Sequence, residues 1–207
     1  MFLEVFIIGI LTGMSPGPDF LMVIKNSLSH GKKIGIATAF GIGTALIFHA
    51  IYTVLGLTII IQSYTWLFNI LQILGALYLS YLGVLAIFSL FKNNKLSLAV
   101  DNSPKEPKSF FQGFKNGLFC NLLNPKAFLF FLGIFSQFFS PTTAKWLEFI
   151  YAFEIVIATS LWFVFLSIVI STNFFRLQYE RISKFIDGIF GGILIYFSYR
   201  IAKNIFN

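Results

Sequence analysis

The stretch GMSPGPDFLMV, Gly13 to Val23, interrupts the first apolar segment of the chain with two prolines, a glycine and an aspartate. Proline removes a backbone donor and clashes with the carbonyl one turn earlier, so Pro16 and Pro18, with Gly17 between them, predict a break in the helix. In lipid, the backbone groups that such a break frees need partners, and these exist only inside the protein or beside a water-filled cavity. The stretch therefore predicts a cavity at this depth of a membrane helix.

The composition around this stretch places the chain in the membrane class. Of 207 residues, 57% are hydrophobic and only 11% are charged, which is too few charges for the surface of a soluble domain of this length. The segment 34–61 carries no charge apart from a possible one on His49, and the segment 66–91 carries none. About 20 apolar residues suffice to cross a bilayer, so we expect an all-α protein that crosses the membrane several times.

The positive charge of the chain is concentrated in the segments that connect the apolar ones. Most of the 15 lysines and arginines lie within 25–33, 92–115 and 176–184. Positive loops stay on the cytoplasmic side of a membrane, so the sequence predicts an N-terminus outside and a location in the cytoplasmic membrane. Arg200 and Lys203 weaken this orientation. The net charge of +7 is not gathered into a basic patch with stacking residues, so we expect no nucleic-acid partner.

Six membrane-spanning segments are predicted, at about 2–24, 34–61, 66–91, 110–139, 146–170 and 185–205. The polar linker 92–109 divides them into two halves, 1–91 and 110–207, with three spans each. The halves look related, since SPGPDFLMV in the first span has an analogue in LNPKAFLFF, residues 123–131, in the fourth. An odd number of spans per half forces the second half to insert upside-down, which predicts two inverted three-helix repeats with broken helices 1 and 4.

The charged residues beside the two breaks are the main candidates for function. Asp19 is an ionisable residue inside a span and therefore a functional candidate, although it could instead cap the helix that resumes after the prolines. In the fourth span, Asn124, Pro125 and Lys126 repeat the pattern with the opposite charge. One carboxylate, one ammonium and exposed helix ends would suit a zwitterionic amino acid. The alternative is a charge pair that only holds two helices together.

The motifs GMSPGPDFLMV, GIGTALIFH (41–49), GALYLSYLG (75–83) and GFKNGLFCNLLNPKAFLFFLGIFSQF (113–138) resemble the LysE/RhtB family of bacterial amino-acid exporters. The resemblance covers nearly the whole chain, and the combination of SPGPD with LLNPKA is specific. It implies a transporter of the cytoplasmic membrane that exports amino acids or their derivatives and is driven by the proton gradient. The chain departs from the family at Ser136, where a proline is more usual.

Two further ionisable residues lie within the predicted spans. His49 could relay protons, because the ordinary pKa of histidine lies near physiological pH, or it could be a neutral side chain hydrogen-bonded between helices. Glu154 is a second candidate for the proton-carrying carboxylate. The predicted substrate and proton site therefore has ten members: Ser15, Pro16, Gly17, Pro18, Asp19, His49, Asn124, Pro125, Lys126 and Glu154.

Other functions remain open from the residues alone. The embedded Asp, Glu and His would be ligands if the chain transported a metal or another ion, and Asp19 and His49 would be acid and base in an enzyme acting on lipid. Neither a zinc pattern, a nucleophile elbow nor a phosphate-binding loop appears, so we expect no cofactor and no enzymatic activity. The single Cys120 allows no internal disulfide. The oligomeric state is left open, a homo-oligomer included.

Overall fold

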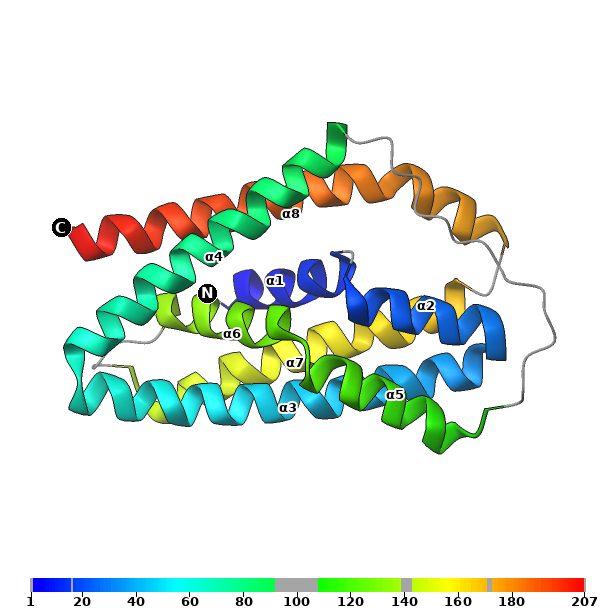
Figure 1. Ribbon diagram of the computed structural model, residues 1–207, viewed down its shortest axis with the longest axis horizontal. Coiled ribbons are helices and arrows are strands. Elements are labelled where there is room, and N and C mark those ends of the chain that lie inside the picture. Colours follow the sequence, from blue (N-terminus) through cyan, green and yellow to red (C-terminus); the bar gives the residue numbers. More distant parts are fainter. Residues whose placement is uncertain (1, 16, 92–107, 139–142, 171–172, 207) are drawn as a thin grey trace.

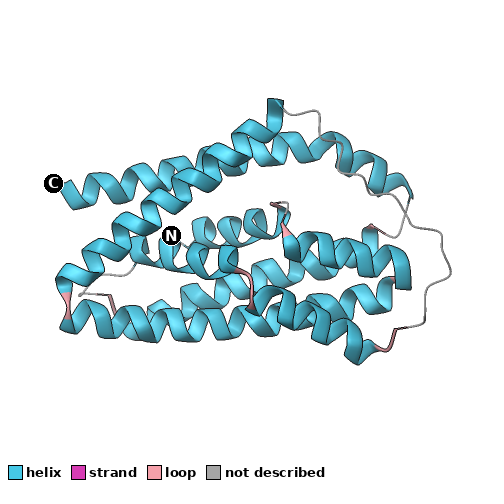
Figure 2. Cartoon of the chain, viewed as in Figure 1, coloured by secondary structure: helices cyan, strands magenta, loops and turns pink. Residues whose placement is uncertain are grey.

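The computed structural model describes the chain except for residues 1, 16, 92–107, 139–142, 171–172 and 207. The described residues form helices joined by loops and contain no strand (Figure 2). The helices are α1 (Phe2–Met14), α2 (Pro18–His30), α3 (Lys32–Ser63), α4 (Thr65–Phe91), α5 (Phe110–Leu122), α6 (Pro125–Phe138), α7 (Lys145–Val169) and α8 (Asn173–Phe206).

Both predicted breaks are present. The first segment is divided into α1 and α2, which are bent by 61°, and the fourth into α5 and α6, which are bent by 56°. The second halves, α2 and α6, each begin with a proline, Pro18 and Pro125. Proline suits the first position of a helix because its missing N–H would have no partner there and its φ is already helical. The prolines that end one half-helix therefore start the next.

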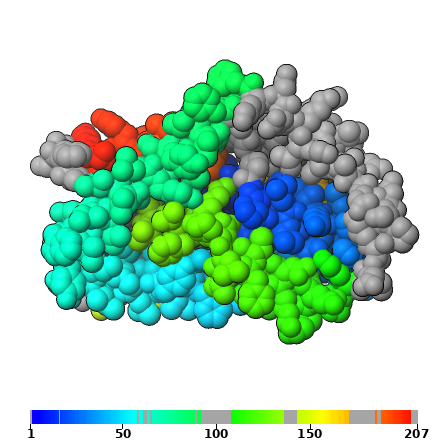
Figure 3. Space-filling view, viewed as in Figure 1, coloured from blue at the N-terminus to red at the C-terminus, as the bar shows by residue number. Residues whose placement is uncertain are grey.

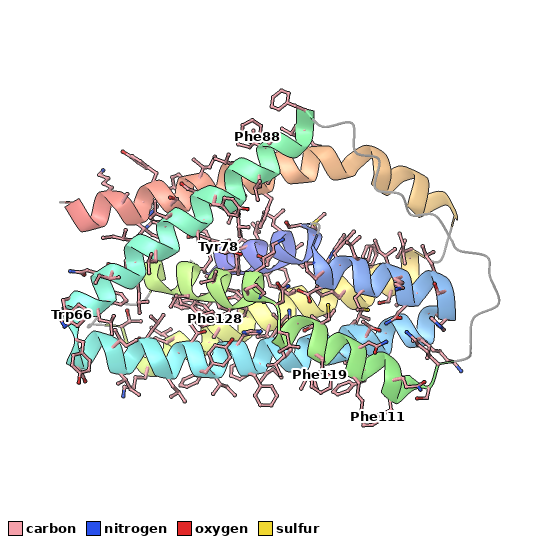
Figure 4. The ribbon with its side chains drawn as sticks, in the orientation of Figure 1. Trp66, Tyr78, Phe88, Phe111, Phe119 and Phe128 are labelled. Atoms are coloured by element: carbon pink, nitrogen blue, oxygen red, sulfur yellow. The ribbon has the colours of Figure 1, made fainter. Side chains whose placement is uncertain are left out.

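The membrane assignment follows from helix length and apolar content. In the described part of the chain, α3, α4 and α7 are each long and apolar enough to cross a bilayer, and the two bent pairs raise the number to as many as five. The labelled Trp66, Phe88, Phe111 and Phe119 point away from the bundle (Figure 4) and are 54–64% exposed. Large apolar side chains on the outside are what a lipid environment favours.

The last helix differs from its prediction. The predicted sixth span covers 185–205, whereas α8 begins at Asn173, twelve residues earlier. The additional segment, NFFRLQYERISK, carries three basic residues and one acidic residue. A charged segment of this kind lowers the hydropathy on which the prediction rests, but it does not prevent helix formation, because arginine, lysine, glutamate and glutamine are all good helix formers.

The helices pack through close approaches at glycine. The α3 helix lies along α5 and α7, α1 lies along α7, and α4 crosses the bundle beside α8 (Figure 1). A Cβ atom at Gly117 of α5 would overlap the Thr38 carbonyl of α3, and one at Gly41 of α3 would overlap the Phe114 carbonyl of α5. Without a hydrophobic force between helices in lipid, such contacts supply much of the packing energy. The α3–α5 contact holds the second break in place.

Candidate functional site

The two breaks meet at one cavity inside the bundle. Its volume is about 30 Å³, enough for roughly one or two water molecules. The helix after the first break, α2, also borders the helix before the second break, α5, on the surface of the molecule (Figure 3). The polar part of the cavity lining comes from both breaks and from α7: Thr12, Ser15, Asp19, Asn121, Asn124, Lys126 and Thr159.

Asp19 lies in the first turn of α2, directly after Pro18. The side-chain amides of Asn121 and Asn124 both donate to its Oδ2 atom, at 3.0 and 2.8 Å. Its Oδ1 atom is buried and has no hydrogen-bond partner among the described residues. A carboxylate at a helix N-terminus interacts favourably with the helix dipole, so both the amides and α2 stabilise a negative charge at this point, with one oxygen left to bind something else.

Lys126 occupies the corresponding position of α6, directly after Pro125. Its backbone N–H donates to Asn124 Oδ1 at 3.0 Å, and its Nζ donates to Ser15 Oγ at 3.0 Å. A Cβ atom at Gly17 would lie 3.2 Å from this Nζ, so the bare backbone at Gly17 leaves room for the ammonium. A cation at a helix N-terminus opposes the helix dipole. The Lys126 ammonium and the N-terminus of α6 therefore both attract an anion to this part of the cavity.

Asn124 connects the two charges. Its amide nitrogen donates to Asp19, while its amide oxygen accepts from the backbone of Lys126. The Lys126 ammonium also acts electrostatically on the Asp19 carboxylate. The fold thus places a carboxylate and an ammonium, each on the first turn of a half-helix, in one cavity.

The ten predicted site residues are distributed as follows. Ser15, Gly17, Asp19, Asn124 and Lys126 line the cavity. Pro18 and Pro125 start the half-helices that carry Asp19 and Lys126, and Pro16 lies outside the described residues.

His49 and Glu154 are not part of the lining. Glu154 lies on α7, five residues before Thr159, and its Oε2 atom is buried without a hydrogen-bond partner in the described part of the chain.

Sequence reasoning did not select Asn121, Thr12 or Thr159. Asn121 precedes Asn124 by three residues in CNLLNPK, so it lies about one turn away on the same side, and this spacing was the available signal. Thr12 and Thr159 donate to carbonyls of α1, those of Ile8 and Gly9. Threonines that bond to a helix carbonyl are common in membrane helices. Neither Thr12 nor Thr159 therefore stands out in the sequence.

His49 supports the second break from α3. It is 1% exposed, and its Nε2 lies 3.1 Å from the Asn121 carbonyl oxygen. A carbonyl only accepts, so Nε2 carries a proton, and Nδ1 shares a hydrogen bond with the Tyr52 hydroxyl. In an unbroken helix the Asn121 carbonyl would accept from residue 125, which is a proline without an N–H. The Asn124 backbone N–H and His49 Nε2 both donate to the Asn121 carbonyl instead, so His49 forms a hydrogen bond between α3 and the second break.

Replacing His49 with phenylalanine should destabilise the protein by about 1–2 kcal/mol. The ring would still stack on Phe131, but the Asn121 carbonyl would lose a buried donor. The thermal unfolding temperature of the purified protein in detergent measures the effect. His49→Gln, which restores a side-chain N–H, should recover part of the loss, and Tyr52→Phe, which leaves the bond to Asn121 in place, should cost less. A His49→Phe protein as stable as the unchanged one would disprove this role.

A membrane bundle whose two broken helices present opposite charges to an interior cavity has the architecture of a secondary transporter. This is the class of protein that the fold and the site define.

The chain belongs to the LysE type translocator family, whose sequence model matches residues 10–204. It is therefore a multi-pass transport protein of the cytoplasmic membrane and not an enzyme, as the sequence predicted. It is 31% identical over 196 residues to the threonine efflux protein of Escherichia coli (strain K12), with 93% of each chain covered. It is 32% identical over 186 residues to the uncharacterized membrane protein YrhP of Bacillus subtilis (strain 168), with 88% of this chain and 89% of the relative covered. No solved structure matches the chain.

Proposed function

We propose that the protein exports amino acids from the cytoplasm and that the Asp19–Lys126 cavity is its substrate site. The observation that carries this proposal is the placement of one carboxylate and one ammonium, on the first turns of α2 and α6, in a single interior cavity. The family and the relatives named threonine efflux protein support the same function.

The charges of the site match the two ends of an amino acid. Asp19 Oδ1, which has no partner in the described part of the chain, would accept from the substrate ammonium. The substrate carboxylate would meet the Lys126 ammonium and the positive end of the α6 dipole, which favours anions. Asn124 bonds to both Asp19 and the Lys126 backbone, so it would hold the two binding groups at a constant separation.

Transport requires a second conformation. A cavity of about 30 Å³ is too small for an amino acid, so the bundle must open toward one side and then the other. Inverted repeats permit this by rocking one half against the other. We assign residues 1–91 and 110–207 to two inverted three-span repeats joined by the linker 92–109, with the N-terminus outside.

The pattern of helix contacts supports the repeat. The first half-helix of each repeat packs on the middle helix of the other: α1 on α7, and α5 on α3. The third helices, α4 and α8, pack on each other, whereas the second half-helices differ: α2 lies mainly along α3, and α6 mainly along α4. A two-fold axis that exchanges the repeats would produce the α1–α7, α5–α3 and α4–α8 pairings.

Proton coupling completes the proposal. Asp19 would exchange a proton with the outside so that the empty carrier can return, because a protonated carboxyl carries no charge through the low-dielectric interior. Glu154, whose Oε2 is buried, is the second candidate for this role.

Everted membrane vesicles test the function directly, because export from the cell becomes uptake into the vesicle. Vesicles that contain the protein should accumulate labelled threonine when respiration is energised, and a protonophore should abolish the accumulation. Vesicles prepared without the protein are the control. Equal uptake by both preparations, tested with threonine and a panel of other amino acids, would rule out the proposed function.

A further inference from the structure

The charged side chains that line the cavity within the described part of the chain are Asp19 and Lys126. In the proposed function, these two charges meet the ammonium and the carboxylate that every amino acid carries. A third charge, on a substrate side chain, would then have no opposite charge within the described lining. An unpaired charge in the middle of a membrane protein is costly even on the most favourable scales.

The rest of the cavity is largely apolar. We define the apolar wall as Phe20, Leu46, Phe130, Phe131 and Phe163, all of which line the cavity and are at most 4% exposed. Phe20 directly follows Asp19, and Phe130 lies one helical turn after Lys126 on α6. The wall therefore lines the same cavity as the groups that would hold the two charged ends of the substrate.

Two of the three hydroxyl groups in the described lining have no proton to offer a polar side chain. The Thr12 and Thr159 hydroxyls donate to the carbonyls of Ile8 and Gly9 at 2.6 and 2.8 Å. Ser15 Oγ accepts from Lys126 Nζ. The two threonine protons are thus already used within the protein, whereas the Ser15 proton and Asn121 Oδ1, which has no partner in the described part of the chain, can serve an uncharged polar group.

We infer that the site takes amino acids with uncharged, mainly apolar side chains and excludes those whose side chains are cationic or anionic. This inference rests on the proposed function and deepens it. The ammonium and carboxylate of the substrate pair with Asp19 and Lys126, and its side chain packs against the apolar wall once the cavity has opened. Charged side chains are rejected because the described lining provides no counter-charge for them.

The test uses the purified full-length protein in proteoliposomes that are preloaded with an unlabelled amino acid. Uptake of the labelled form of that amino acid then measures exchange. Two pairs of substrates differ mainly in charge. Norleucine has the carbon chain of lysine without its terminal ammonium, and glutamine has the shape of glutamate. We expect norleucine to be preferred over lysine, and glutamine over glutamate, by at least about tenfold in Vmax/KM. Norleucine should also be preferred over glutamine.

A matched pair of variants tests the role of the wall. Phe130→Ala removes a wall residue, whereas Phe128→Ala removes a phenylalanine from the same helix that is 39% exposed and does not line the cavity. Phe130→Ala should raise the KM for norleucine several-fold more than the KM for alanine, whose methyl group hardly reaches the wall. Phe128→Ala should leave the ratio of the two KM values unchanged. The ratio is independent of how much folded protein is present.

The outcomes separate the inference from the proposed function. Exchange of norleucine and glutamine without lysine and glutamate supports both. Exchange of lysine or glutamate at a rate similar to that of its uncharged counterpart overturns the inference and leaves amino-acid transport intact. An unchanged KM ratio in Phe130→Ala also overturns it, because the wall would then not contact the side chain. Absence of exchange with every amino acid overturns the proposed function and the inference with it.

Discussion

Replacing Asp19 with asparagine is expected to abolish proton-driven efflux while the protein still inserts and folds. Asparagine has the same shape, and its amide oxygen can still accept from Asn121 and Asn124, which now bond to Asp19 Oδ2. It cannot bind or release a proton, and it presents no negative charge to the substrate ammonium. A hydrogen bond to a charged group contributes about 1.5–3 kcal/mol, so we also expect substrate affinity to fall roughly 10- to 100-fold.

The measurement is uptake of labelled amino acid into everted vesicles, with the amount of inserted protein determined by immunoblotting. Glu4→Gln removes an exposed carboxylate from the first turn of α1 and serves as the matched control. Normal proton-driven uptake by Asp19→Asn would show that Asp19 is neither the proton carrier nor essential for binding. Glu154→Gln, measured beside it, distinguishes the two carboxylates, because the variant that uncouples uptake from the proton gradient identifies the proton carrier.

Replacing Lys126 with methionine is expected to raise the KM for the substrate by a similar factor, roughly 10- to 100-fold. Methionine keeps most of the length and the apolar stem of lysine but loses the ammonium that now bonds to Ser15 Oγ. The substrate carboxylate would then meet only the N-terminus of α6. The Asp19 carboxylate would also lose the positive charge that acts on it from Lys126.

Competition by an amino-acid amide makes this test specific. Threonine amide lacks the carboxylate, so the unchanged protein should bind it more weakly than threonine, and Lys126→Met should reduce that difference. Lys115→Met is the control, because Lys115 is an exposed lysine of α5 that lies over the Phe111 ring. If Lys126→Met kept the KM of the unchanged protein, Lys126 would serve only to hold helices together.

Much of the fold was predictable because hydropathy and proline act locally. The segments 34–61, 66–91 and 146–170 agree with α3, α4 and α7 to within about two residues at each end, since an uninterrupted apolar run has no other way to satisfy its backbone in lipid. Pro18 and Pro125 marked both breaks for the same reason. The start of α8 was missed because the charged segment after Asn173 is helical without being apolar.

The site was partly predictable for a different reason. A charged residue beside a helix break is costly in lipid, so Asp19 and Lys126 could be selected one at a time. The apolar wall could not, because a single phenylalanine in a chain with 28 phenylalanines is not distinguished by its neighbours in sequence. His49 was selected, but its partner, the Asn121 carbonyl 72 positions away, could not be foreseen.

The sequence by itself determined that the chain is a helical membrane protein, where two of its helices break, and that each break carries a charge. These properties depend on residues within one or two helical turns of each other. Only the tertiary structure decided that both breaks line one cavity, that Asn124 bonds to both Asp19 and the Lys126 backbone, and that a wall of phenylalanine borders these groups. The physical reason is that such contacts depend on how close the backbones of separate helices can approach, which is fixed where glycines such as Gly41 and Gly117 meet a facing carbonyl.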